Sequence, residues 1–181
     1  MAIRHIIEAP DAYLRTISKP VACVDAATHA LVADMFETMY AAPGIGLAAI
    51  QVGVAQRILV IDLQRPDEAA AEEGEEAPPL REPRAFINPE IVWASDDVAS
   101  YNEGCLSVPE LYGDVERPAR VRVTWLDLDD TRQEAEFDGL FATCFQHEMD
   151  HLDGVLFYDH LSKLKRDMIV KKLVKAQKKA A

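Results

Sequence analysis

The chain has 181 residues, of which 49% are hydrophobic, so it is long enough for one domain with a sizeable core. Its net charge of −12 argues against a general DNA-binding protein, and no apolar run approaches the length of a membrane span. The N-terminus lacks the layout of a secretory signal. The three cysteines have no repeated spacing, so they do not predict a disulfide framework. We therefore expect a single cytoplasmic domain, residues 1–181.

The N-terminal quarter of the chain predicts one helix. Residues 1–24 mix turn and extended signals, and Cys23 is expected there as a small packed hydrophobic residue. Asp25 is a candidate N-cap for a helix that runs to about Ala41. The apolar residues of this helix recur at spacings of four and predict one buried face, formed by Leu31, Met35 and Met39 with Val32, Phe36 and Tyr40.

The segment from Gly44 to Gln51 follows. Its glycines let the backbone approach a ligand closely, and the Gln51 amide can donate a hydrogen bond without binding a metal. Taken alone, the segment is better explained as an ordinary Gly-rich turn entering a strand, because it does not complete a phosphate-binding loop.

The middle of the chain predicts strands. Apolar runs at residues 57–63 and 85–93 indicate two buried strands, and residues 64–84 between them, rich in Ala, Glu and Pro, indicate a mobile acidic loop. Apolar and polar residues alternate in an extended segment at 115–128, and residues 133–137 are expected to return as its hairpin partner.

The segment Phe145–His151 carries the strongest chemical signal. Residues four apart lie on one face of a helix, about 6 Å apart along its axis, so the imidazoles of His147 and His151 can converge on one metal ion. Glu148 projects roughly 100° away from His147, where it can act as a general base. Apolar flanks predict a buried helix within residues 139–154, and a metal explains two histidines in a core.

A third ligand is needed, because catalytic metals usually have three protein ligands and an open position. The metzincin pattern places it at Phe157, which cannot bind a metal, and the gluzincin pattern needs a downstream glutamate, which the chain lacks after Glu148. Several other downstream residues stay open as ligands: Asp153, Asp159, Asp167 and His160.

The cysteines are the other source of a ligand. Cys144 lies on the same face as His147, but its Cα would be about 10 Å from that of His151, too far for a short side chain to share the ion. Cys105 belongs to a separate segment, and Gly104 gives that segment backbone freedom. We therefore favour Cys105, His147 and His151 as the metal ligands.

Three segments resemble, in order and at similar separations, the motifs of bacterial peptide deformylases: Gly44–Gln51, Glu103–Ser107 and Gln146–His151. The resemblance covers most of the chain, although residues 64–84 form a longer insertion than is usual. It implies an α+β fold with mixed or antiparallel sheets wrapped around the H-E-x-x-H helix and an additional C-terminal helix. It also implies removal of the formyl group from N-formylmethionyl nascent polypeptides.

The resemblance further implies a metal and residue roles. One divalent ion is expected, Fe(II), with Zn, Ni or Co as alternatives that the ligand types do not exclude. Glu148 would be the general base, and the Gln51 side-chain amide and the Leu106 backbone N–H would stabilise the oxyanion.

Substrate binding is less clearly indicated. By resemblance the peptide would lie extended beside Ile45 and Gly46, with the methionine side chain in an apolar pocket that Leu140 and Cys144 help to form. Core packing explains Leu140 almost equally well.

The C-terminal segment, residues 162–181, has eight Lys or Arg and one Asp, so it carries +7 whereas the rest of the chain carries −19. We expect a helix with Leu164, Met168, Leu173 and Ile169 on one face. Its lysines could bind ribosomal RNA, as the corresponding extension does in similar deformylases; a solvated helix docked on the body is the alternative.

Two other functions remain to be weighed. The first is a zinc endopeptidase that uses the same H-E-x-x-H chemistry. The second is a metal-stabilised ribosome-binding protein without catalytic activity, although such a structural site would not need Gln51 or Glu148.

Overall fold

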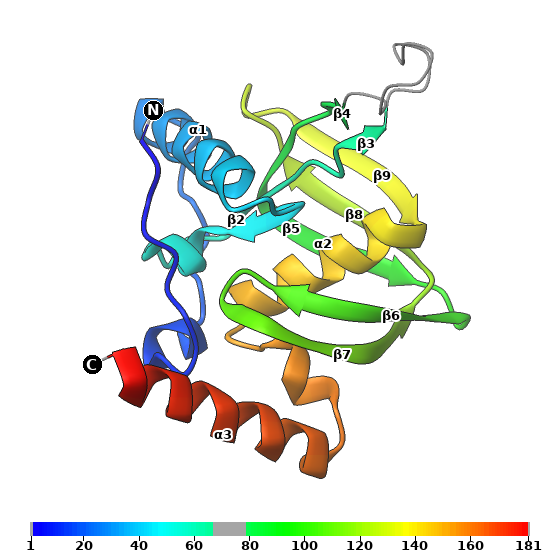
Figure 1. Cartoon of the computed structure of the whole chain (residues 1–181). Helices are drawn as coiled ribbons and strands as arrows, with labels where there is room; N and C mark the ends of the chain where they lie inside the picture. Colours follow the sequence, from blue (N-terminus) through cyan, green and yellow to red (C-terminus); the bar gives the residue numbers. More distant parts are fainter. Residues whose placement is uncertain (1, 67–78, 181) are drawn as a thin grey trace, which may run out of the picture.

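The computed structural model describes residues 2–66 and 79–180, and its architecture is α+β, as expected (Figure 1). The helices of this part are α1 (Ala26–Ala41), α2 (Gly139–Leu152) and α3 (Lys163–Ala180), with short 3-10 helices η1 (Ala12–Arg15), η2 (Ala49–Val52) and η3 (Phe157–His160). None of the helices in the described ranges combines the length and apolarity that a bilayer crossing requires.

The strands form one large sheet and two smaller pairs, and every strand pair described is antiparallel. The five-stranded sheet has the order β1 (Gly46–Ala48), β2 (Ile58–Ile61), β5 (Arg84–Ala94), β8 (Arg120–Leu126), β9 (Arg132–Asp138). The pairs are β3 (Arg65–Pro66) with β4 (Pro79–Leu80), and β6 (Val98–Cys105) with β7 (Val108–Pro118).

The sheet is buried on both faces at β2, which explains why β2 reads as a continuous apolar run. Ile58 and Val60 pack in the same core cluster as the apolar face of α1. Leu59 and Ile61 pack in a second cluster with α2. The alternation of strand side chains thus holds α1 and α2 on opposite faces of one sheet.

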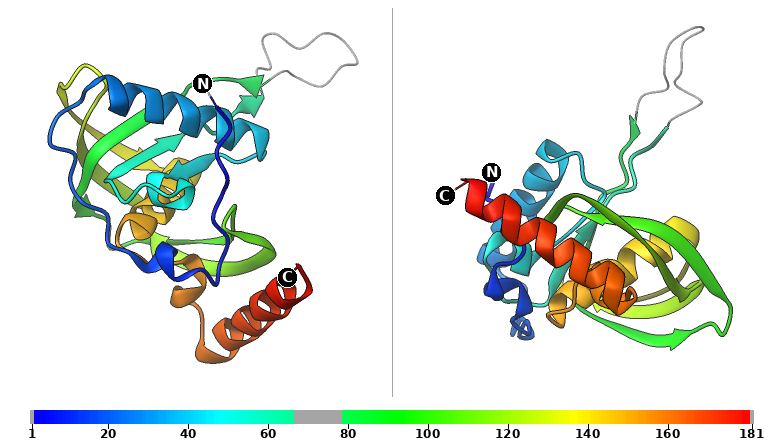
Figure 2. Two further views of the ribbon diagram at one scale, coloured as in Figure 1. Left: turned by 90° about the vertical axis from the view of Figure 1, so that its left-hand side faces the viewer. Right: turned by 60° about the horizontal axis from the view of Figure 1, so that its bottom comes forward.

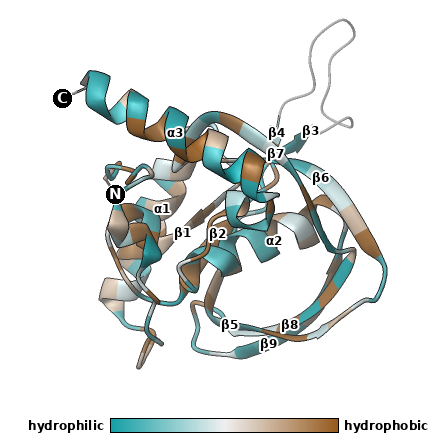
Figure 3. Ribbon diagram, turned by 90° about the horizontal axis from the view of Figure 1, so that it is seen from below, coloured by the Kyte–Doolittle hydropathy of each residue, from teal (hydrophilic) through white to brown (hydrophobic). Residues whose placement is uncertain are grey.

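Helix α2 is enclosed by β-structure. The large sheet curves around it, and the β6–β7 hairpin covers it from the other side (Figures 1 and 3). Phe86, Phe137 and Phe145 form edge-to-face or tilted ring contacts in the core between sheet and helix. Gly154, at φ +72°, ends this segment, and a Cβ there would meet the Arg15 carbonyl at 2.5 Å, so only glycine fits.

The first helix follows the sequence prediction closely. The Asp25 side chain accepts a hydrogen bond from the Thr28 N–H at 2.9 Å, as an N-cap should. The predicted face is the packed face: Leu31, Val32, Met35 and Met39 are buried, and Phe36 and Tyr40 pack against them. Cys23, by contrast, is exposed, so its expected packing is wrong.

The extended segment expected at 115–128 is two strands in different sheets. The chain leaves β7 at Pro118, whose nitrogen cannot donate to a ladder, and enters β8 at Arg120. The N–H of Ala119 donates to the Asp97 carbonyl at 2.8 Å, which fixes this corner between the sheets. Strand β6, the partner of β7, was not expected, because most of its residues are polar or small.

Two short strands near the ends of the expected acidic loop, β3 and β4, pair with each other as a β-ribbon. Arg65 pairs with Leu80 and Pro66 with Pro79. Residues 67–78, where most of the predicted mobile loop falls, lie outside the described residues.

Helix α3 lies along the outside of the molecule and buries only two of the four apolar residues expected on its docked face (Figure 2). Ile169 and Leu173 are buried in a cluster with Leu14, whereas Leu164 and Met168 are 72% and 53% exposed. Within each pair the residues are four apart, so each pair forms an apolar stripe along the helix. Met168 and Ile169 are successive residues, so the two stripes lie about 100° apart around the helix axis. The hydropathy colouring shows apolar and polar segments alternating along α3 (Figure 3).

Candidate active site

Three side chains meet beside α2 with the donor atoms of a metal site. One ligand atom each of Cys105, His147 and His151 lies within 4.8 Å of the other two, and Cys105 Sγ is 3.1 Å from His151 Nε2. The histidines come from successive turns of α2, and the cysteine comes from the end of β6. Two imidazoles and a thiol fit a transition-metal ion, so this group could hold one.

The histidines are prepared for such a role. His147 Nδ1 lies 2.8 Å from Glu103 Oε2, and because an ionised carboxylate only accepts, Nδ1 donates and Nε2 is the nitrogen that a metal would use. Burial lowers the pKa of His147, but hydrogen bonds with Cys105 and Glu103 raise it well above its ordinary value, so a metal would displace a proton from Nε2. Burial lowers the pKa of His151 well below its usual value, so this imidazole is neutral and keeps a lone pair for coordination.

Glu103 belongs to a charged network that runs from His147 to the surface. Arg117 donates to both Glu103 oxygens, at 2.6 and 3.0 Å, and to Asp150 at 2.8 Å, and His160 lies 2.7 Å from the same Asp150 oxygen. Burial would raise the pKa of Glu103, but the hydrogen bonds from His147 and Arg117 keep it below its ordinary value. The carboxylate therefore stays ionised and holds the His147 ring.

Glu148 is buried next to the ligands without a full set of hydrogen bonds. Among the described residues, its Oε2 has no hydrogen-bond partner. Burial raises its pKa to about 7. A carboxyl group in this state can both take and return a proton near neutral pH.

Gln51 and Ser107 surround the cysteine with donors. Gln51 Oε1 accepts from the Ala48 N–H at 2.8 Å, which turns the amide nitrogen towards Ser107 Oγ at 3.0 Å and Cys105 Sγ at 3.6 Å. The Ser107 N–H lies 3.4 Å from the same sulfur. Both donors therefore point at the sulfur atom of the candidate metal ligand.

The site opens into a cleft of about 470 Å³. The expected site residues that line it are Ile45, Gly46, Gln51, Cys105, Leu106, Leu140, Cys144, His147 and Glu148. His151 is fully buried beneath them. Gly46 is required at the cleft wall, because a Cβ there would come within 2.5 Å of Glu148 and 2.7 Å of Cys144.

Most of the other candidate ligands are engaged elsewhere. Asp153 pairs with Arg57 at 2.7 Å, and Asp159 pairs with Arg15. Burial raises the pKa of the Cys144 thiol well above its ordinary value, so this cysteine is poorly suited to coordinate a metal.

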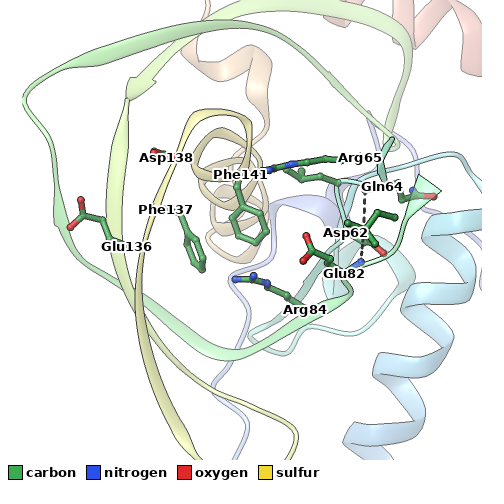
Figure 4. A pocket seen from close by; sticks show the side chains of 11 residues that line it. Asp62, Gln64, Arg65, Glu82, Arg84, Glu136, Phe137, Asp138 and Phe141 are labelled. Atoms are coloured by element: carbon green, nitrogen blue, oxygen red, sulfur yellow. Dashed lines mark hydrogen bonds between the residues drawn. The ribbon is translucent and has the colours of Figure 1, made fainter. Parts of the chain in front are cut away.

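A second pocket, of about 290 Å³, lies between the β3–β4 ribbon and the corner where β9 enters α2 (Figure 4). Arg84 lies over the rings of Phe137 and Phe141 there, with Glu82 and Arg65 nearby. None of the three clustered residues lines this pocket, so the candidate metal site belongs to the larger cleft.

Sequence reasoning missed the network behind His147. Glu103 stands two residues before Cys105, in a strand that faces α2, and a ligand histidine usually needs a carboxylate or carbonyl on its other nitrogen. That requirement was a usable signal for Glu103. Arg117 and His160 lie outside the motifs, and only the fold brings them near.

Known proteins match both the sequence and the fold. The profile of the polypeptide deformylase family matches residues 3–167. A peptide deformylase of Rhizorhabdus wittichii is 61% identical over 178 residues, which cover 98% of this chain and 97% of that protein.

Solved structures give the same answer. The crystal structure of peptide deformylase from Ehrlichia chaffeensis has a TM-score of 0.88 and 41% identity, covering 99% of both chains. That of a peptide deformylase from Legionella pneumophila has a TM-score of 0.84 and 43% identity, covering 98% of this chain and 96% of the other. With its sequence, fold and Cys-His-His cluster all in agreement, the chain belongs to the polypeptide deformylase family.

Proposed function

We propose that this deformylase hydrolyses the formamide bond of N-formylmethionyl polypeptides at the cleft, with Cys105, His147 and His151 holding one divalent metal. The observation that carries the proposal is the buried, incompletely bonded Glu148 carboxyl beside these three ligands. The metal would supply a Lewis acid, which lowers the pKa of a water molecule and polarises the formyl carbonyl. Family membership favours this reaction over an endopeptidase or a non-catalytic ribosome-binding protein.

Glu148 is the proton carrier in this proposal. It takes a proton from the attacking water as the oxygen bonds to the formyl carbon. It then returns that proton to the nitrogen as the C–N bond breaks, which releases formate and the free amine. The raised pKa of the carboxyl, about 7, suits both transfers near neutral pH.

Two donors stabilise the negative oxygen that develops at the formyl carbon. The Gln51 amide nitrogen is already turned towards Cys105 by the Ala48 N–H, so little reorganisation is needed. The Leu106 backbone N–H, next to Cys105 at the cleft wall, is the second donor.

The substrate lies extended along Ile45 and Gly46. Strand β1 is at the edge of the large sheet, so its outer side can pair with a peptide backbone. Cys144 and the 44%-exposed Leu140 line the same cleft and form the methionine pocket. An exposed leucine in the cleft is better explained by substrate contact than by core packing.

Fe(II) is the working metal in this proposal, although Zn, Ni and Co suit the same donors. A thiolate beside Fe(II) is open to oxidation. We expect the iron-loaded enzyme to lose activity in air faster than the nickel- or cobalt-loaded enzyme, as a time course of formate release would measure. Equal decay of all three forms would contradict the role of iron.

A ribosomal contact through α3 belongs to the same proposal and places the enzyme in the cytoplasm with its substrate. Lysines are exposed along α3 on the side away from Ile169 and Leu173. Reversing the charges of Lys171 and Lys175 leaves the docked face intact and should reduce co-sedimentation with ribosomes. Unchanged co-sedimentation would remove α3 from the proposal.

The reaction itself is tested by formate release from formyl-Met-Ala-Ser amide. We expect release that a chelator abolishes and that added metal restores, with no cleavage of internal peptide bonds. Internal cleavage would support the endopeptidase, and release of neither product by the metal-loaded protein would support the non-catalytic function.

A further inference from the structure

The carbonyl of Gly44, at the rim of the cleft, is held by a side chain from outside the family motifs. Gln64, between β2 and β3, donates from its amide nitrogen to this carbonyl at 3.0 Å. The two residues are 20 positions apart, and Gln64 has a φ of +48°, a conformation that residues other than glycine rarely adopt. Surrounding contacts must therefore hold it there.

This hydrogen bond extends the pairing of β1 with β2. The last paired residues of the ladder are Gly46 and Ile61, and beyond them the Asp62 N–H donates to the Ile45 carbonyl at 3.0 Å. The next carbonyl towards the N-terminus, before β1 begins, is that of Gly44. The Gln64 side chain supplies the donor that the backbone no longer provides.

Gly44 is fixed on its other sides as well. Its N–H donates to the Met39 carbonyl at the end of α1, at 2.9 Å. A Cβ on Gly44 would meet the Leu106 side chain at 2.6 Å, so the backbone lies directly against the segment that follows Cys105. A shift of the Gly44 peptide would move the cleft wall.

A buried carboxylate keeps Gln64 in place. Asp62 is 1% exposed, and its Oδ1 accepts from the N–H groups of Gln64 at 3.0 Å and Glu82 at 3.2 Å (Figure 4). Its other oxygen accepts from the Tyr40 hydroxyl at 2.6 Å, and the Arg81 guanidinium lies over the Tyr40 ring. Both ends of the β3–β4 ribbon are thus tied to one acid behind the cleft wall.

We propose that Gln64 is a positioning residue for substrate: its amide fixes the Gly44 carbonyl and thereby orients the Ile45–Gly46 backbone along which the peptide binds. This inference rests on the proposed function, because it assigns Gln64 a task in binding that substrate. Gln64 touches neither the ligands nor Glu148, so its effect falls on binding and leaves the chemical step unchanged.

The test compares Gln64→Glu, which keeps the shape but presents an acceptor to the carbonyl, with Gln64→Lys, which restores a donor. A neutral substrate, formyl-Met-Ala-Ser amide, removes long-range charge effects. We expect Gln64→Glu to raise KM roughly 3- to 10-fold, the effect of one lost hydrogen bond, with kcat within about twofold of the wild type. Gln64→Lys should return KM towards the wild-type value.

Gln56→Glu, a change of the same kind at an exposed position, is the matched control and should leave KM unchanged. A wild-type KM in Gln64→Glu, a fall in kcat without a change in KM, or failure of Gln64→Lys to restore KM would each overturn the inference. Absence of formate release by the metal-loaded wild type would instead refute the proposed function, so the two failures are distinguishable.

Discussion

At the scale of single residues, the environment of Glu148 decides what its carboxyl can do. Burial raises its pKa to about 7, and a metal ion at the neighbouring ligands would lower this pKa again, because a cation favours the ionised form. The base works only when it is ionised. The acid limb of the pH profile of kcat/KM should therefore lie at or below pH 7.

Removing this carboxyl separates metal binding from catalysis. Glu148→Ala should retain its metal, because Glu148 is not one of the three clustered ligands. Its kcat should fall by roughly 100-fold or more, the usual contribution of a general base. Metal analysis together with formate release checks both parts; a metal-loaded variant with a near wild-type rate would show that another group carries the proton.

The pairing of the two histidines in the Cys-His-His cluster was predictable from the sequence because its geometry is local. A spacing of four on a helix places His147 and His151 on one face whatever the rest of the fold does. Cys105 was favoured because it comes from a separate segment that can approach the two histidines. The ion pairs of Arg117 could not be predicted in this way, because Glu103 and Asp150 meet Arg117 only through the packing of β6, β7 and α2.

At the scale of secondary structure, periodicity predicted where helices lie better than which face they bury. Helix α1 has a single apolar stripe, so its packed face was clear. Helix α3 has two apolar stripes. The stripe with Ile169 and Leu173 is the buried one because it faces the core cluster around Leu14. Strand β6 was missed because its pairing with β7, and not an apolar pattern, stabilises it.

The docked face of α3 gives a stability prediction. Ile169→Ala removes a buried side chain and should lower the free energy of unfolding by about 2–4 kcal/mol. Leu164→Ala, at a position that is 72% exposed, should change it by less than about 0.5 kcal/mol. Urea denaturation measures both; equal losses would mean that α3 docks by its other stripe.

At the scale of the whole molecule, the network of Glu103, Arg117, Asp150 and His160 joins the β6–β7 hairpin to α2 and η3. Arg117 and Glu103 are both buried, so their pairing is shielded from solvent. The pKa values of Glu103 and Asp150 are below their ordinary values: burial raises each, and hydrogen bonds and charges from Arg117 and the histidines outweigh it.

These lowered pKa values predict how stability depends on pH. Groups of this kind stabilise the fold above their ordinary pKa, about 4, and that stability is lost as pH falls through their lower folded values. Arg117→Met should therefore cost about 3–5 kcal/mol at pH 7, because it leaves a buried charge unpaired, and the difference from wild type should shrink in strong acid. Denaturation at pH 7 and pH 3 tests this; a difference independent of pH would contradict it.

The identity of the third ligand is the point on which the account depends most. Cys105→Ala should lose the metal and formate release together, whereas Cys144→Ala, which alters a cysteine in the same cleft outside the ligand cluster, should keep its metal. Metal content per chain, measured after purification of the two variants in parallel, decides the matter directly. One metal ion per chain in active Cys105→Ala would contradict the site described for this enzyme.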